Sequence, residues 1–169
     1  MASKLRVDSI LPVDGAPTGG GGGIIQVVQA VTGDAQSIGT QTYTTLNNLS
    51  LAITPKFNTS KILINVSLMI GINVSTNTVV SGRIFRGSTD LSINSSSDNH
   101  GMFVRYIGNN TETMEMMNYM HLDSPATTSA TTYSIKLRGD NDSAFYVNRY
   151  ANTSGYKYQS SITLMEVSA

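Results

Sequence analysis

Apolar residues alternate with polar ones in several short segments of the chain, the pattern of β-strands with one buried face. No segment keeps the 3.6-residue period of a long amphipathic helix, which argues against a parallel sheet with crossover helices. In five segments, the residues that would share a face are Leu49, Leu51 and Ile53; Ile62, Ile64, Val66, Leu68 and Ile70; Tyr133, Ile135 and Leu137; Phe145 and Val147; and Ile162 and Leu164.

Turn-forming residues separate the apolar segments at short intervals. Many short strands divided by Gly, Pro, Asn and Asp turns are typical of antiparallel β-sandwiches. We therefore predict an all-β fold, an antiparallel, jelly-roll-like β-sandwich. The turns are expected at Gly33–Asp34, Pro55–Lys56, Asn73–Asn77, Gly87–Asp90, Asn94–Asn99, Gly108–Asn110, Ser124–Ala126 and Ser154–Gly155.

The segment 113–122, TMEMMNYMHL, is compatible with a strand or a helix. A helix of this length is marginal on its own, so we predict a strand. We expect its methionine-rich face to fill the core rather than to bind partners. As a strand, that face contains Met114, Met116, Met120 and Leu122.

The N-terminal residues differ from the rest of the chain. Residues 1–18 lack strand periodicity, and five consecutive glycines, Gly19–Gly23, follow them. A glycine run behaves as a flexible linker. We therefore predict an extended arm with its hinge in residues 1–23 and a β-sandwich head in residues 24–169.

Several strands are apolar on both faces over part of their length, which favours self-association of the head.

Composition narrows the classes of partner. The chain is 40% hydrophobic and 13% charged, with a formal net charge of zero and no cysteine. This charge balance gives no long-range attraction to nucleic acid or an anionic membrane. No apolar run approaches the ~18 residues of a membrane-spanning helix, and no apolar stretch follows Lys4 and Arg6 as in a secretory signal. We expect no nucleic-acid partner, no membrane insertion and no secretion.

Residues that could perform catalysis or bind metal are sparse. His100 and His121 lie in separate segments without acidic or histidine neighbours at metal-ligand spacing. Asp140–Asn141–Asp142 lacks the glycine and distant glutamate of a calcium loop, so we predict a hairpin turn there. No Gly-x-Ser-x-Gly motif occurs. We expect no metal, no cofactor and no enzymatic activity, although glycosidase carboxylates can lie far apart in sequence.

An aromatic cluster near the C-terminus is a candidate for binding. Tyrosine and arginine carry many adhesive interfaces, and tyrosine rings stack on sugars. The alternative is that these are ordinary strand residues at the rim of a sheet. With the loop residue His100, the candidate receptor-contact residues are His100, Tyr146, Arg149, Tyr150, Tyr156 and Tyr158.

Five phrases together resemble one family: SKLRVDSILPVDG, GGGGGIIQVVQAV, LDSPATTSATTYSIK, FYVNR and SSITLMEV. The chain is similar, over nearly its whole length, to small tail-fibre or virion fibre proteins of marine and cyanobacterial tailed phages. This resemblance implies a trimeric β-sandwich head and an N-terminal segment that docks on the particle. Spaced apolar residues suit docking in a groove or on a sheet edge, and here they are Leu5, Val7, Ile10, Leu11, Pro12 and Val13.

We therefore expect a non-enzymatic phage virion structural protein, made in the host cytoplasm and located on the virion. Its expected form is a short homotrimeric tail fibre, with tail or capsid proteins and a host surface glycan or protein as partners. Multivalency would strengthen weak single contacts. The alternative is a capsid decoration or cement protein, or a head fibre, that stabilises the virion. A glycan-cleaving head is a third, more distant reading.

Overall fold

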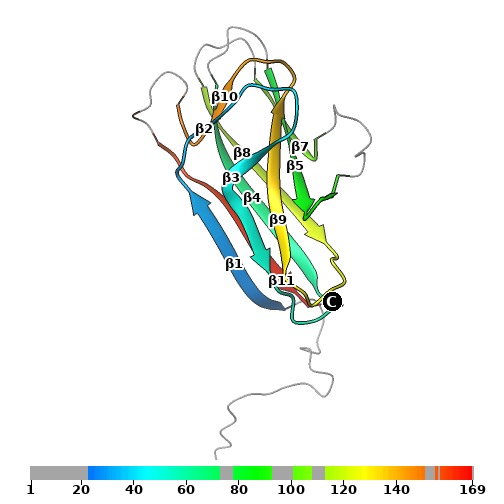
Figure 1. The fold of residues 1–169 in the computed structure, drawn as a ribbon. Helices are drawn as coiled ribbons and strands as arrows, with labels where there is room; N and C mark the ends of the chain where they lie inside the picture. The colour runs from blue at the N-terminus through cyan, green and yellow to red at the C-terminus, as the bar shows by residue number, and fades with distance from the viewer. Residues whose placement is uncertain are drawn as a thin grey trace, which may run out of the picture.

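The computed structural model describes residues 23–72, 78–92, 101–107, 113–150, 155 and 157–168. Within these residues it contains eleven strands and no helix (Figure 1). The strands are β1 (Ile24–Thr32), β2 (Gln36–Ile38), β3 (Thr44–Ile53), β4 (Lys61–Ile72), β5 (Thr78–Arg86), β6 (Thr89–Asp90), β7 (Phe103–Ile107), β8 (Thr113–Asp123), β9 (Thr131–Gly139), β10 (Phe145–Val147) and β11 (Ser160–Val167).

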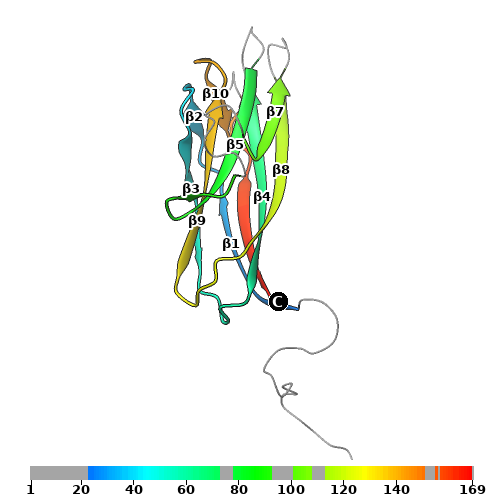
Figure 2. The same cartoon turned by 90° about the vertical axis from the view of Figure 1, so that its right-hand side faces the viewer.

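The strands form two antiparallel sheets that run along the long axis of the molecule (Figure 2). In sheet A, β8 pairs with one edge of β4, and both β11 and β10 pair with the other edge. β1 then pairs with β11, and β2 with β10. In sheet B the order is β3, β9, β5, and both β6 and β7 pair with the far edge of β5.

The connectivity is that of an eight-stranded jelly roll, if β1 with β2, β10 with β11 and β6 with β7 each count as one strand position. The chain changes sheet at every connection except that from β5 to β7. The first position lies beside the last in sheet A, as the double Greek key of a jelly roll requires. The predicted all-β, jelly-roll-like sandwich is therefore confirmed.

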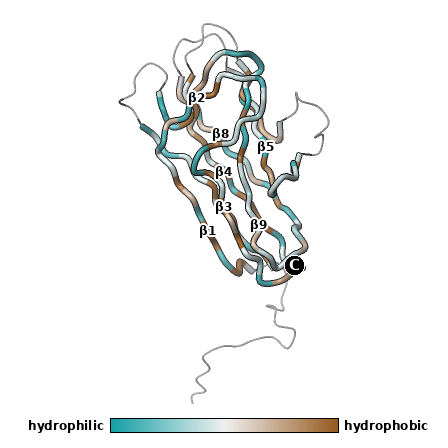
Figure 3. Tube along the Cα trace, in the orientation of Figure 1, coloured by the Kyte–Doolittle hydropathy of each residue, from teal (hydrophilic) through white to brown (hydrophobic). Residues whose placement is uncertain are grey.

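The core lies between the sheets and has β4 at its centre. Along β4, every second residue from Ile62 to Ile72 is fully buried. β9 contributes Tyr133, Ile135 and Leu137 from the opposite sheet. The inward faces predicted for the five alternating segments are confirmed, although Leu51 is only partly buried. Figure 3 shows the alternation of apolar and polar residues along the strands.

The segment 113–122 is a strand, as predicted, but its methionine-rich face does not fill the core. In β8 only Met117 reaches the core with little exposure, whereas Met116 and Met120 are exposed. The inward face is the other one, because Tyr119 stacks on Phe103 with ring centroids 5.3 Å apart. The expectation that the methionine-rich face is buried was therefore wrong.

The turn at Asp140–Asn141–Asp142 is present, but it does not form a hairpin. It connects β9 in sheet B with β10 in sheet A, so the two flanking strands do not pair with each other. Asp140 instead accepts a hydrogen bond at Oδ1 from the backbone N–H of Val79 (2.9 Å).

No helix in the described part of the chain is long and apolar enough to cross a membrane.

Candidate functional site

The two ends of the described domain lie at the same end of the sandwich, here called the proximal pole. The backbone N–H of Ser168 donates to the carbonyl oxygen of Gly23 at 3.0 Å. Figure 1 shows the C-terminus at the end where β1 begins. The connections 54–60 and 124–130 lie there as well. The chain therefore enters the described domain at the proximal pole, at Gly23.

A buried carboxylate organises the proximal pole. Glu166 is fully buried in β11, and its Oε1 accepts hydrogen bonds from the backbone N–H groups of Lys56 (2.7 Å) and Phe57 (3.3 Å). Its Oε2 accepts a bond from the side-chain amide of Gln26. Burial by itself raises the pKa of Glu166, but the hydrogen bonds outweigh burial and the net shift of its pKa is downward. Glu166 therefore holds the connection between β3 and β4 as an anion.

Replacing this carboxylate should change both stability and its pH dependence. Because the pKa of Glu166 is lower in the folded state, its contribution is present above the ordinary value of 4.5 and is lost as the pH falls through the folded-state pKa. Glu166→Gln should cost about 1–3 kcal/mol at pH 7. Urea unfolding at pH 7 and in acid should show a smaller acid-induced loss in the variant. Equal pH dependence in both proteins would contradict this role.

The distal pole is the opposite end, where the connections 39–43 and 140–144 lie. Near it, the structure brings together two of the predicted contact residues, Tyr146 and Arg149. The guanidinium carbon of Arg149 lies 4.5 Å from the centre of the Tyr146 ring, a cation–π contact. Tyr146 is half-buried on the outer side of β10. The pair therefore presents an aromatic ring and a cation on the surface of sheet A.

The backbone beside this pair is held rigidly. Asn148 is fully buried with a left-handed φ of 60°, and its side-chain amide donates to the carbonyl oxygens of Thr32 (3.0 Å) and Asp34 (3.2 Å). A Cβ atom on Gly71 would lie 2.0 Å from the carbonyl oxygen of Arg149. Only glycine therefore allows β4 to approach this segment so closely.

Two more of the predicted contact residues, Tyr150 and Tyr158, are both half-buried. His100 and Tyr156 lie outside the described residues. So do the predicted docking residues Leu5, Val7, Ile10, Leu11, Pro12 and Val13.

The outer surface of β1, β11, β4 and β8 in sheet A is broad and almost uncharged; we call it the neutral face. Strand register places its side chains in rows across the four strands. The two middle rows are polar except for one apolar residue each, and apolar rows lie on both sides of them. From the proximal side the rows are Val27, Met165, Leu63 and Leu122; Gln29, Thr163, Asn65 and Met120; Val31, Ser161, Ser67 and Asn118; and Met69 with Met116.

The outer surface of sheet B has the opposite chemistry. Arg83 on β5 and Lys136 on β9 are directly paired in register, and Arg138 is their neighbour. Arg83 forms an ion pair with Asp90 (2.7 Å) and lies 4.3 Å from the ring centre of Tyr43. This cluster was not predicted, because its members come from four separate segments and no local motif joins them.

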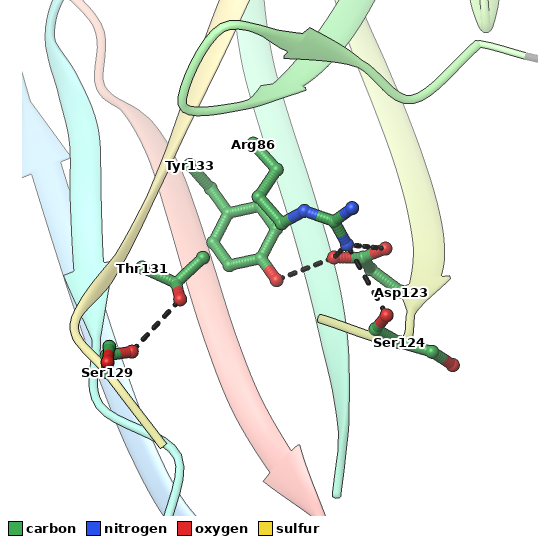
Figure 4. Close-up of polar contacts among 6 residues, drawn as sticks. All are labelled: Arg86, Asp123, Ser124, Ser129, Thr131 and Tyr133. Carbon is green, nitrogen blue, oxygen red and sulfur yellow. Dashed lines mark hydrogen bonds and ion pairs between the residues drawn. The ribbon is translucent and has the colours of Figure 1, made fainter. Parts of the chain in front are cut away.

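A polar network links the two sheets (Figure 4). Nη1 of Arg86 in β5 lies 2.8 Å from each carboxylate oxygen of Asp123, at the end of β8. The buried hydroxyl of Tyr133 donates to Asp123 Oδ2 at 2.7 Å. Burial, with the hydrogen bond and charge of Asp123, raises the pKa of Tyr133. The phenol therefore stays a hydrogen-bond donor, and the network crosslinks β5, β9 and β8.

The acidic side chains of the described residues serve structural roles. In the described residues no cluster of three or more His, Asp or Glu side chains could hold a metal ion. The carboxylates of Asp123 and Glu166 each accept several hydrogen bonds from the protein itself. Their oxygens are thus occupied by structural partners rather than directed at a substrate.

No protein-family model and no curated protein matches the chain. Similar solved structures include the T13 viral particle of infectious bursal disease virus, with a TM-score of 0.42 and 11% identity over 84% of this chain and 37% of that one. A mutant VP2 protein of that virus in T=1 particles has a TM-score of 0.42 and 14% identity over 98% of this chain and 40% of that one. The Gx strain of the virus has a TM-score of 0.40 and 11% identity over 99% and 44%. This chain spans less than half the length of each of them.

Proposed function

We propose that this chain is a non-enzymatic structural protein of a tailed-phage virion, a short homotrimeric tail fibre. Residues 1–23 would anchor it to the particle, and the β-sandwich head would contact a glycan or protein on the host surface. The observation that carries the proposal is the separation of the two poles. The chain joins the head at Gly23 on the proximal pole, whereas the Tyr146–Arg149 pair lies toward the distal one.

The separation matters because an anchored head can present only the surfaces that point away from its anchor. The long strands, such as β4 and β8, run along the axis between the poles, and the Asp123 network ties the two sheets together. A head of this kind would hold the contact residues at a fixed distance from the anchor without a conformational change. Three heads per fibre, and many fibres per particle, would turn weak contacts into firm adhesion.

Immunogold labelling of intact particles with an antibody against the head tests the location. Gold at the tail is the expected result. Labelling over the whole capsid would select the second candidate, a decoration or cement protein. That candidate is favoured by one observation, the broad neutral face of sheet A, which could also clamp neighbouring capsid subunits. Release of reducing sugar from host envelope by purified protein would instead identify the glycan-cleaving head.

The contact role of Arg149 can be tested by competition. Purified full-length protein should inhibit adsorption of the particle to its host cells. Arg149→Ala should raise the concentration for half-inhibition about tenfold, as expected for loss of an arginine anchor. Arg105→Ala is the matched control, because it removes the same charge from an exposed ion pair with Glu115. Equal inhibition by wild type and Arg149→Ala would remove Arg149 from the contact site.

A further inference from the structure

We propose that the neutral face of sheet A is the surface through which copies of this chain associate. The inference deepens the proposed function by naming the surface of self-contact, and it rests on that function for the three-fold symmetry. Five of the eight methionines lie on this face: Met69, Met116, Met120 and Met165 in the rows above, and Met114 beyond them, opposite Gly71. Exposed there are Met116, Met120 and Leu122 on β8 and Val27 and Val31 on β1.

An isolated head has no reason to keep this face apolar. Antiparallel sandwiches commonly alternate apolar residues inward with polar residues outward, so that the outer face is wetted. The outer faces of β1 and β8 break this rule at several positions. Exposed apolar patches of this kind mark sites of association. Methionine also suits such a site, because its flexible thioether adapts to the opposing surface.

The charge distribution indicates what kind of partner fits. On the outer side of β1, β4, β8 and β11, Lys61 at the proximal end is the one charged side chain. Arg149 borders the distal end. A polyanion would need a row of cations, and a sugar would need aromatic rings across the face. A second copy needs neither, and two copies with zero net charge do not repel each other.

The polar residues of the face also suit contact with a second copy of the chain. The rows through Gln29 and Ser67 contain amides and hydroxyls, each of which both donates and accepts hydrogen bonds. Gln29 and Thr163 already pair across β1 and β11 through Nε2 and Oγ1 at 2.9 Å. Groups that both donate and accept hydrogen bonds can pair wherever two parts of this face meet, including the unlike parts that meet in a three-fold ring.

The size of the face is adequate for a stable interface. Four strands at ~4.8 Å spacing and about ten residues at ~3.3 Å each give a surface of roughly 20 by 30 Å. Stable interfaces bury about 800 Å² of accessible surface per partner, which is of the same order once side-chain relief is included. Self-association could therefore use this face without contributions from the loops.

The test is the mass of full-length protein in solution, measured by light scattering and sedimentation velocity. Wild type should be an oligomer that dissociates on dilution. Met120→Glu on β8 and Val27→Glu on β1 should each shift it to monomer, because each places a charge in the interface. Val104→Glu on the outer side of sheet B is the control, since Val104 is 63% exposed and Met120 64%. Circular dichroism and urea unfolding establish that each variant is folded.

Each result decides the proposal. A wild type that stays monomeric at high concentration would overturn it, and so would an oligomer that survives both sheet A variants or is dissociated only by Val104→Glu. Peroxide oxidation with mass spectrometry provides a second readout: Met116 and Met120 should react more slowly as wild type associates. Protection of both residues in a monomer would show that the chain covers its own face. None of these outcomes depends on where the protein lies on the particle.

Discussion

Asp123→Ala should lower the free energy of unfolding by about 3 kcal/mol, the largest loss expected from any single polar substitution in the head. The change leaves the buried Tyr133 hydroxyl without an acceptor and removes the partner of Arg86. Breaking a buried pair by removing one member typically costs about 3–5 kcal/mol. The lower end applies here because the Arg86 side chain is 29% exposed and can recruit water. Urea unfolding followed by circular dichroism measures the difference.

Glu115→Ala provides the matched control for Asp123. It breaks a second arginine–carboxylate contact of 2.8 Å, between β8 and β7, whose carboxylate side chain is 31% exposed against 9% for Asp123. Exposed ion pairs contribute about 0–1 kcal/mol, so the loss should be small. If both variants lost the same free energy, burial of the Asp123 network would not be the source of its contribution.

The alternating segments could be predicted because one face of each is apolar at every second position. β4, β9 and β11 fall in this class, and their inward residues are those that the pattern selects. β5 could not be found this way, because six of its nine residues are buried and these come from both faces of the strand. Arg83 is covered by Asp90 and Tyr43, and Gly82 leaves room for Phe103, whose ring a Cβ atom would meet at 2.0 Å. These are tertiary partners that no local pattern reveals.

β8 illustrates a different limit. Period-two alternation correctly assigns its residues to two faces, but it does not say which face turns inward. Hydrophobicity favours the methionine-rich side, yet the chain buries the side of Met117, Tyr119 and Asp123. The choice depends on Arg86 and Phe103 in the other sheet, which receive the carboxylate and the tyrosine ring. Long-range partners therefore decided the orientation.

The candidate contact site was predictable only in part. Tyr146 and Arg149 are close in sequence, and the bend at Asn148 brings their side chains together. Strands that are apolar on both sides indicated a face of this kind in the sequence. The extent of the neutral face, however, depends on the register between β1, β11, β4 and β8. Register joins residues more than a hundred positions apart, such as Val27 and Met165.

The two outer faces of the sandwich together restrict how heads can assemble. Association through the neutral face would leave the cationic outer surface of sheet B, with Arg83, Lys136 and Arg138, on the outside of the oligomer. If the long axes are parallel, every proximal pole lies at one end of the oligomer, and with it every Gly23. With association through the neutral face and parallel axes, the oligomer would have all its attachment points at one end and all its Tyr146–Arg149 pairs toward the other.

Deleting residues 1–22 should leave a head of nearly unchanged stability and abolish its incorporation into the virion. Every residue of the described hydrophobic core lies between Ile38 and Leu164, so the deletion removes none of it. Gly23 is kept because its carbonyl oxygen accepts the hydrogen bond from Ser168. The free energy of unfolding should change by less than about 1 kcal/mol, because the deletion leaves every residue of the described core in place. Incorporation is measured by adding tagged protein during infection and probing purified particles.

The matched control for this deletion is a full-length protein in which the six proposed docking residues are replaced by serine. It keeps the length and the glycine run of the N-terminal segment but removes the apolar side chains of Leu5, Val7, Ile10, Leu11, Pro12 and Val13. Loss of incorporation in both proteins would assign docking to those side chains, because apolar contacts in a groove are what both lack. A deleted protein that still enters particles would place the anchor on the head, and one that unfolds would make residues 1–22 part of the domain.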